Sequence, residues 1–454
     1  MLDPRLTGAL GALALSLLAP RSTAAQEHCH PAPTPADSAA AADSAAMAPM
    51  AGMTMRPGPL GISRTREGSG TAWLPDASSM HALHGQAGEW ELMLHGSLFI
   101  HYLDDGGDRG REQFGATNWI MGMARRPAAG GDVMLRVMLS ADPVTADECG
   151  YPDLLATGEF CDDEPLHDRQ HPHDVFMELA AVYERALGDD LALQLYGGPV
   201  GEPALGPVAF PHRVSSFPNP IAPIGHHWLD STHIAFGVAT AGIYGRRWKA
   251  EGSLFNGREP DAERYDFDLD ALDSYSGRFW LLPNERWALQ ISAARLNEAE
   301  VHEPGGPRID VTRVTASATY HRPLAEGGVW ANTIAWGRNR EEGQATHAIL
   351  AETNVNLAER DLFYGRLEIV EKTGGDLVLP EQLEDESFTI GKLGLGYIRQ
   401  LGAVAGLVPG FGVGVTVARV TDELETSYGS TTPMGVQLFL RLRPAPMAVG
   451  GHAH

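Results

Sequence analysis

The sequence contains few cysteines, few lysines and no long apolar run beyond its N-terminal region. Three cysteines in 454 residues exclude a disulfide scaffold, although Cys149 and Cys161 share one turn-rich connection and are expected to pair in an oxidising compartment. A formal net charge of −24 argues against nucleic acid as a partner. Because no later stretch approaches the roughly 18 apolar residues of a membrane helix, any membrane residence must come from strands.

The first 25 residues have the pattern of a secretory signal peptide. Arg5 precedes an apolar run at about residues 6–19, and Thr23, Ala24 and Ala25 supply the small residues of a cleavage site. The sequence therefore predicts an exported protein with a cleaved signal at residues 1–25.

From about Trp90 to Arg443 the chain consists of segments in which apolar and polar residues alternate, as in strands with one polar face. Most segments are long enough to cross a bilayer on a tilt. We expect strands at residues 90–102, 118–126, 131–140, 175–187, 191–198, 233–244, 248–255, 274–282, 287–296, 312–321, 328–338, 344–356, 361–370, 388–401, 411–421 and 435–443.

The connections between these segments are alternately short and long, except for 339–343, which is too short for the pattern. Short ones, such as 127–130 and 188–190, are rich in the turn formers Gly, Pro and Asp, whereas 141–174 and 199–232 are long. A soluble all-β protein, the alternative, has no reason for this asymmetry. We therefore predict an all-β fold, a transmembrane antiparallel up-and-down β-barrel of about 16 strands (roughly 14–18), with short periplasmic turns and long extracellular loops.

Two points stay open in this prediction. Residues 175–187 (VFMELAAVYERAL) are good helix formers, and a helix there would change the strand count and its parity. The strands of monomeric and trimeric barrels show the same two-residue alternation of apolar and polar side chains, so the oligomeric state is not predicted. The barrel is expected at 86–443, and a tail at 444–454 follows it.

Residues 26–85 are rich in Ala, Pro, Ser and Met, a composition that predicts a disordered periplasmic segment. This segment carries potential metal ligands at His28, Cys29, His30, Met47, Met50, Met53 and Met55. Sulfur ligands select Cu(I), and imidazole accepts copper or zinc; the alternative is a spacer without ligands. The segment resembles the Met/His-rich N-terminal regions of outer-membrane copper-resistance proteins, and this resemblance implies handling of copper or another transition metal.

Two histidine-bearing loops on the same rim form a second candidate metal site. Its residues are His171, His173, Asp174, His226, His227, Asp230 and His233. Imidazole and carboxylate ligands suit zinc, copper or another borderline metal, whereas the alternative is that these histidines only stiffen their loops. The prolines of 197–224 predict an ordered loop, either a constriction folded inward or a lid.

We therefore expect a porin-like channel in the bacterial outer membrane, surrounded by lipid and passing small solutes or metal ions, and no enzymatic activity. One alternative is a barrel-embedded hydrolase, in which Ser215, Ser216 or Ser231 would need a histidine within hydrogen-bond reach. The other is a surface ligand-binding barrel with a plugged lumen.

Overall fold

A computed structural model describes residues 55–162, 164–301 and 306–446. The predicted signal peptide, the candidate ligands from His28 to Met53 and the residues after 446 lie outside these ranges. Within them, no helix has both the length and the apolar composition that a membrane crossing requires. The described helices are short: α2 (Asp142–Thr145), α3 (His226–Leu229) and α4 (Glu425–Tyr428), with six 3-10 turns.

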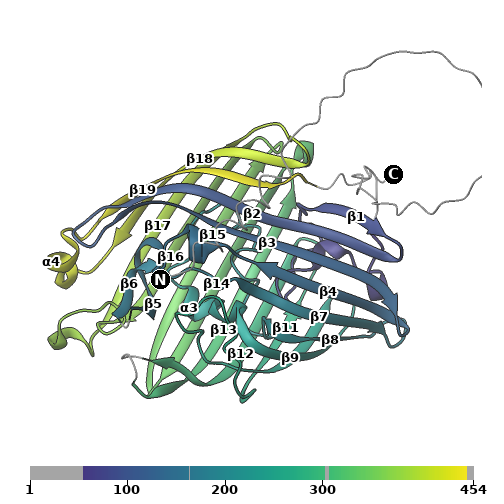
Figure 1. Ribbon diagram of the computed structural model, residues 1–454, viewed down its shortest axis with the longest axis horizontal. Helices are drawn as coiled ribbons and strands as arrows, with labels where there is room; N and C mark the ends of the chain where they lie inside the picture. Colours follow the sequence, from purple (N-terminus) through teal and green to yellow (C-terminus); the bar gives the residue numbers. More distant parts are fainter. Residues whose placement is uncertain (1–54, 163, 302–305, 447–454) are drawn as a thin grey trace, which may run out of the picture. The chain divides into compact units, whose positions relative to one another are not determined.

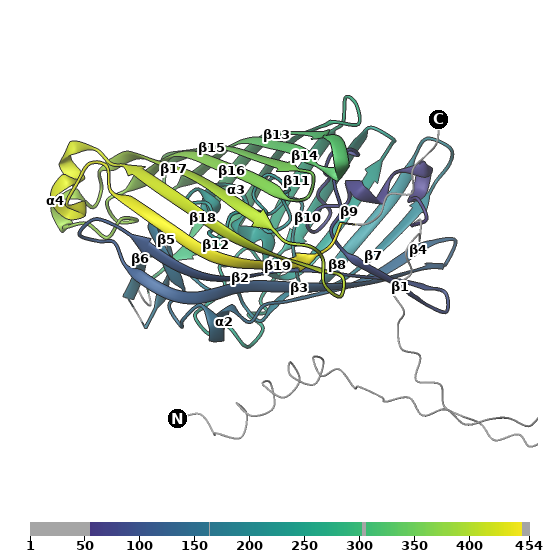
Figure 2. The same ribbon diagram turned by 90° about the horizontal axis from the view of Figure 1, so that it is seen from above.

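The strands form a closed antiparallel barrel whose tilted wall is visible in Figures 1 and 2. The main sheet has seventeen strands, of which β1 (Leu83–Ala87) is a short arm paired with the start of β2. The other sixteen close into a ring, because β19 pairs with β2. These ring strands are β2 (Trp90–Asp105), β3 (Glu112–Ala128), β4 (Gly131–Leu139), β7 (Phe176–Ala186), β8 (Ala192–Gly201), β9 (Ala235–Tyr244), β10 (Trp248–Phe255), β11 (Ser274–Leu281), β12 (Trp287–Val301), β13 (Arg308–Pro323), β14 (Val329–Glu341), β15 (Gln344–Leu357), β16 (Asp361–Thr373), β17 (Ser387–Gln400), β18 (Leu407–Arg419) and β19 (Met434–Pro444).

Each of the sixteen predicted segments is a ring strand, so the predicted barrel and its even strand number are confirmed. The ambiguous segment 175–187 is strand β7, in which Ala180 and Val182 face inward while Leu179 is 37 % exposed on the outer face. β7 pairs with β4 on one side and β8 on the other. This pairing satisfies its backbone and overrides the helix propensity of its residues.

The two faces of the wall differ in polarity. Large aliphatic side chains stand on the outer face, for example Ile334 (62 % exposed) and Leu254 (55 % exposed). The inner face of β10 carries Lys249, Glu251 and Ser253, all buried. An apolar exterior around a polar interior is the arrangement of a barrel that faces lipid. The predicted outer-membrane type of barrel is therefore confirmed.

Aromatic side chains gather at the rim of short turns. The ring centroids of Trp287 and Tyr320 are 4.8 Å apart, and those of Tyr320 and Trp330 are 6.0 Å apart. The three residues come from neighbouring strands β12, β13 and β14, near the ends joined by short turns. They form part of the interfacial girdle that such barrels place at the lipid headgroups.

Three segments pack inside the ring. The inner N-terminal segment comprises residues 57–80, and the β5–β6 hairpin (β5 Tyr151–Cys161, β6 Glu164–Gln170) lies in the β4–β7 connection. The lumenal segment, residues 202–234, joins β8 to β9 and includes α3. Most of its side chains are buried, including Arg213 and Trp228.

The inner N-terminal segment corrects the prediction that residues 26–85 are disordered, because residues 55–85 have a defined structure. Arg64 is buried and bonds Glu184 of β7 at 2.7 Å. Trp73, 6 % exposed, packs edge-on against Tyr244 of β9 at 5.7 Å. The segment has too few apolar residues to fold alone, but the inner wall supplies the missing core and the charged partners.

The lumenal segment reaches much of the inner wall. It bonds Ser253 of β10 through the amide of Ala204 (2.7 Å) and Ser292 of β12 through that of Gly206 (2.9 Å). Further wall contacts come from Arg278 of β11, Arg313 of β13, Asn339 of β14, Glu352 of β15, Arg366 of β16, Thr117 of β3 and Met138 of β4. The expectation that this loop folds inward is confirmed, and it is not a lid.

Candidate metal centre

The two histidine-bearing loops predicted from the sequence converge inside the barrel, toward the rim of long loops. Their five imidazoles, here called the outer histidine cluster, belong to His171, His173, His226, His227 and His233. Neighbouring ring centroids are 5.1–6.4 Å apart. Phe210 of the lumenal segment lies between them, 5.3 Å from His226 and 5.8 Å from His173.

Carboxylates and a carbonyl group orient these imidazoles. The Nδ1 atoms of His173, His226 and His227 bond Asp142, Asp230 and Glu259 at 2.8, 2.8 and 2.9 Å respectively. His233 Nδ1 donates to the carbonyl of Asp230 at 2.9 Å, and His171 Nε2 lies 3.2 Å from Glu159. A carboxylate on one ring nitrogen, as on His173 and His226, is the usual outer-shell support of a metal-bound histidine, because it fixes the tautomer and the ring orientation.

Two of the five imidazoles have a second ring nitrogen without a hydrogen-bond partner among the described residues. The Nε2 atoms of His227 and His233 are buried and make no hydrogen bond within the described part of the chain. A buried nitrogen of this kind has lost its hydration without gaining a protein partner, which is costly. A bound ion or water would satisfy it.

Burial keeps several of these imidazoles neutral, which is the form that binds metals. Burial lowers the pKa of His171 well below its ordinary value, and the neighbouring Arg264 lowers it further. Burial and the neighbouring His226 likewise lower the pKa of His233. Burial alone would raise the pKa of Asp230, but Arg213 and His226 hold that pKa below its ordinary value.

One set of ligand atoms already converges. His227, Glu259 and Glu300 each offer an atom within 4.8 Å of the others; among the described His, Cys, Asp and Glu side chains only two other groups do so, a cluster around the Cys149–Cys161 disulfide and one of exposed aspartates. Two carboxylates this close cannot both stay ionised without a proton or a cation between them. One imidazole and two carboxylates suit a borderline divalent metal. We call this triad the candidate metal centre.

The remaining predicted ligands have other positions. Asp230 pairs with Arg213 at 2.8 Å within the lumenal segment, while Asp174 lies 3.8 Å from Arg264. Burial raises the pKa of Asp174 to about 6. Met55 lies far along the barrel, in a cavity wall with Met80 and Met134.

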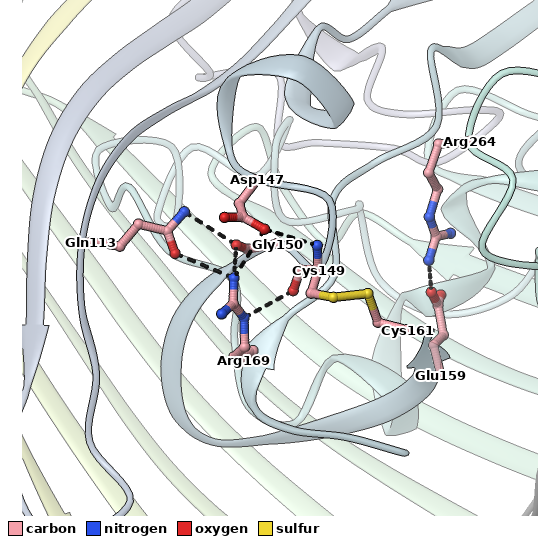
Figure 3. The surroundings of a disulfide bond; sticks show 8 residues. All are labelled: Gln113, Asp147, Cys149, Gly150, Glu159, Cys161, Arg169 and Arg264. Atoms are coloured by element: carbon pink, nitrogen blue, oxygen red, sulfur yellow. Dashed lines mark hydrogen bonds and ion pairs between the residues drawn. A yellow bond between two sulfur atoms is a disulfide. The ribbon is translucent and has the colours of Figure 1, made fainter. Parts of the chain in front are cut away.

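A disulfide links Cys149, which precedes β5, to Cys161 at the end of β5, so it bridges the two ends of this strand (Figure 3). Arg169 donates to the carbonyl oxygens of Cys149 and Gly150 at 3.0 and 2.6 Å. Glu159, on the same hairpin, forms an ion pair with Arg264. The covalent link and these contacts fix the hairpin that holds the carboxylate partner of His171.

The carboxylates Glu159, Glu259 and Glu300 were not predicted as site residues. Glu259 lies 32 residues from the histidine it contacts, and no spacing in the sequence connects the two. The serines considered for a hydrolase bond other groups: Ser215 bonds Thr333 (2.8 Å), Ser216 bonds Arg366 (2.7 Å) and Ser231 bonds Arg313 (2.9 Å). Their contacts therefore give no support to a serine–histidine pair.

No protein-family model matches the chain, and neither does any curated protein sequence. Among solved structures, the chain is similar to the anion-selective porin from Comamonas acidovorans, with 11 % identity over 78 % of this chain and 100 % of that one, and a TM-score of 0.47. It is also similar to OmpF of Salmonella typhi in complex with daunomycin, with 9 % identity over 79 % of this chain and 100 % of that one, and a TM-score of 0.47. A third similar structure is the outer-membrane channel DcaP of Acinetobacter baumannii, with 9 % identity over 79 % of this chain and 98 % of that one, and a TM-score of 0.45. The assignment to an outer-membrane barrel rests on the strand pairing and the lipid-facing wall of this chain.

Proposed function

We propose that the protein is a channel-type outer-membrane barrel that handles a divalent transition metal, such as copper or a related heavy-metal ion. The observation that carries this proposal is the convergence of five histidines from two loops with the triad His227, Glu259 and Glu300. The triad brings together the lumenal segment (His227), the connection between β10 and β11 (Glu259) and strand β12 (Glu300), so a bound metal would link the segment to the barrel.

The channel part of the proposal is supported by how the lumenal segment is held. Its wall contacts are hydrogen bonds, ion pairs and apolar packing, such as that of Trp228 and Leu229 in one cluster with Leu350 and Val370, and its two ends continue into the adjacent strands β8 and β9. These contacts are separate from the strand pairings, so release of the segment would leave the ring intact. Part of the inner wall carries polar and charged side chains, among them Lys249, Glu251 and Arg278, as a wet channel requires.

A second candidate function is a ligand-binding barrel with a closed lumen. It is favoured by the number of wall strands that the lumenal segment contacts, from β3 to β16, because each contact must break before solutes pass. The two functions differ in conductance, which makes them separable.

The test measures single-channel conductance of the refolded mature protein in planar bilayers, with and without copper(II), and the metal content of the same protein. A matched pair of variants accompanies it: His171, His173, His226 and His227 replaced by Ala, and His347→Ala as the control. His347 stacks on Trp336, outside the cluster. Conductance that copper changes in the control but not in the cluster variant is the expected result.

Two results would overturn this proposal. Conductance and copper content that are equal in both variants would make the outer histidines structural. A well-folded barrel that binds copper but never conducts would replace the channel by the closed ligand-binding barrel.

A further inference from the structure

The methionines of the described chain are concentrated on one part of the inner wall. β2, β3 and β4 carry an inner methionine patch of six residues: Met93, His95, Met121, Met123, Met134 and Met138. His95 pairs with Met121, which in turn pairs with Met138, and Met93 pairs with Met123. Directly opposed residues of antiparallel strands have Cβ atoms about 4.5–5.5 Å apart. The sulfurs and the imidazole are therefore close neighbours.

The lumenal segment adds a second imidazole to this patch. His212 Nε2 lies 3.4 Å from the sulfur of Met138, and its ring centroid is 5.4 Å from that of His95. Trp119 packs against both rings, at 4.7 and 5.2 Å. The Nε2 atom of His95 is buried, and no group in the described residues hydrogen-bonds to it. A free ring nitrogen and several thioethers thus share one enclosed region.

Two adjacent cavities lie over the patch. The larger has a volume of about 100 Å³ and is lined by side chains that include Met80, Met93, His95, Met121, Met123 and His212. The smaller, about 40 Å³, shares Met80, Met93 and Met123 with it and adds Met55 and Met134. A cavity needs roughly 10–15 Å³ to hold a water molecule, so both have room for an ion.

Three of the charged groups that line the larger cavity form ion pairs: Glu67 with Arg125 (2.6 Å), Arg136 with Glu178 (3.2 Å) and Arg443 with Glu359 (2.5 Å). A fourth, Arg441, donates to the neutral side chain of Gln400 (3.3 Å) and lies over the ring of Phe217 (5.3 Å). The sulfur of Met134 accepts a hydrogen bond from Arg125 at 3.0 Å, so the ligands left for an ion are the other thioethers and the imidazoles. Hard cations prefer oxygen ligands, whereas thioethers select soft ions such as Cu(I).

We infer that the inner methionine patch and His212 form a binding site for a soft monovalent cation, copper(I) or silver(I), inside the barrel. This site differs from the candidate metal centre in position and in ligand chemistry. It requires neither that the lumen conducts nor that the outer histidines bind a divalent ion. Met55, in the wall of the smaller cavity, follows Met53 by two residues in the sequence.

The test uses silver(I), which shares the preference of copper(I) for sulfur and does not change oxidation state in air. All proteins are full-length mature chains in detergent micelles, and all carry Met47, Met50 and Met53 replaced by Leu, so that N-terminal sulfurs do not contribute. The test variant adds Met121→Leu, Met123→Leu and Met138→Leu, and the control adds Met177→Leu, which is equally buried. Leu replaces Met with little change in volume.

The background protein and the control should each retain one tightly bound silver ion after gel filtration. The test variant should lose affinity by at least about tenfold, as loss of metal-supporting groups commonly does. X-ray absorption of the bound silver in the background protein should show sulfur neighbours. If the triple variant fails to fold, the single changes Met121→Leu and Met138→Leu should each lower the affinity.

Equal silver affinity in the test variant and the control would overturn this inference and leave the methionines as packing residues. Absence of tight binding by the background protein would do the same. Conductance separates the two proposals: a silent barrel that still binds silver contradicts the channel alone, and a conducting barrel without silver binding contradicts this site alone.

Discussion

Replacing Arg213 with methionine should loosen the lumenal segment from the wall. The Arg213 side chain is fully buried, and it donates to Glu352 at 2.7 Å and to Asp230 at 2.8 Å. Methionine keeps the apolar stem but removes the charge, which leaves two carboxylates with exposures of 1 % and 2 % without this partner. Breaking one side of a buried ion pair costs about 3–5 kcal/mol.

The lower end of this range applies, because Glu352 keeps a second partner, Arg366, at 2.9 Å. A loss of about 3 kcal/mol shifts the equilibrium between docked and undocked segment by roughly a hundredfold, since about 1.4 kcal/mol is a factor of ten. The rate at which proteinase K cleaves within residues 202–234 measures this equilibrium, and bilayer conductance gives a second readout.

The control for this prediction is Arg399→Met. Arg399 pairs with Asp361 at 2.6 Å, but the two side chains are 38 % and 31 % exposed, and solvent-exposed pairs of this kind contribute little to stability. Neutralising the two carboxylates that have lost Arg213, with Asp230→Asn and Glu352→Gln, should restore part of the docking in the Arg213→Met variant. Equal cleavage rates for Arg213→Met and Arg399→Met would refute the view that the ion pair between Arg213 and Glu352 holds the segment against the wall.

Two further predictions follow from the described geometry. Burial raises the pKa of Glu202 to about 7 from an ordinary 4.5, so docking should be strongest below about pH 4.5 and weaken by up to about 3 kcal/mol as the pH rises through 7. Cleavage within the lumenal segment should therefore accelerate over this range, and Glu202→Gln should flatten the profile; an unchanged profile in that variant would assign the effect elsewhere. Ile334, exposed near the middle of β14, should tolerate lysine poorly, at a cost of about 2–4 kcal/mol in folding into lipid vesicles. A normal folding yield for Ile334→Lys, measured by the gel mobility shift of folded barrels, would contradict a lipid-facing position.

The ring could be predicted from the sequence because its strands have one polar and one apolar face. The strand predicted at residues 248–255 has the same first and last residue as β10, in which Lys249 and Glu251 alternate with outward apolar positions. The β5–β6 hairpin could not be predicted in this way. It is surrounded by protein inside the lumen, so Leu154 and Leu155 are buried side by side and no period of two remains.

The candidate sites were predictable only in part. The alternation of loops placed the histidines on one rim, but their partners Glu159 and Glu259 depend on how the loops fold inside the barrel. The inner methionine patch was missed because a methionine facing inward looks the same in sequence as one facing lipid. The signal that could have revealed it is the spacing by two or four residues of Met121 with Met123 and of Met134 with Met138, which puts each pair on one face.

The lumenal segment also has a mechanical consequence for the wall. A ring of hydrogen-bonded strands resists stretching along its circumference, but its cross-section can flatten when the surrounding bilayer presses on it. The segment contacts β3 and β4 through Thr117 and Met138, and β15 and β16 through Glu352 and Arg366. These contacts connect two separate parts of the ring to the same segment inside it. A barrel whose segment has swung out would therefore be more easily deformed under lateral pressure than one whose segment is docked.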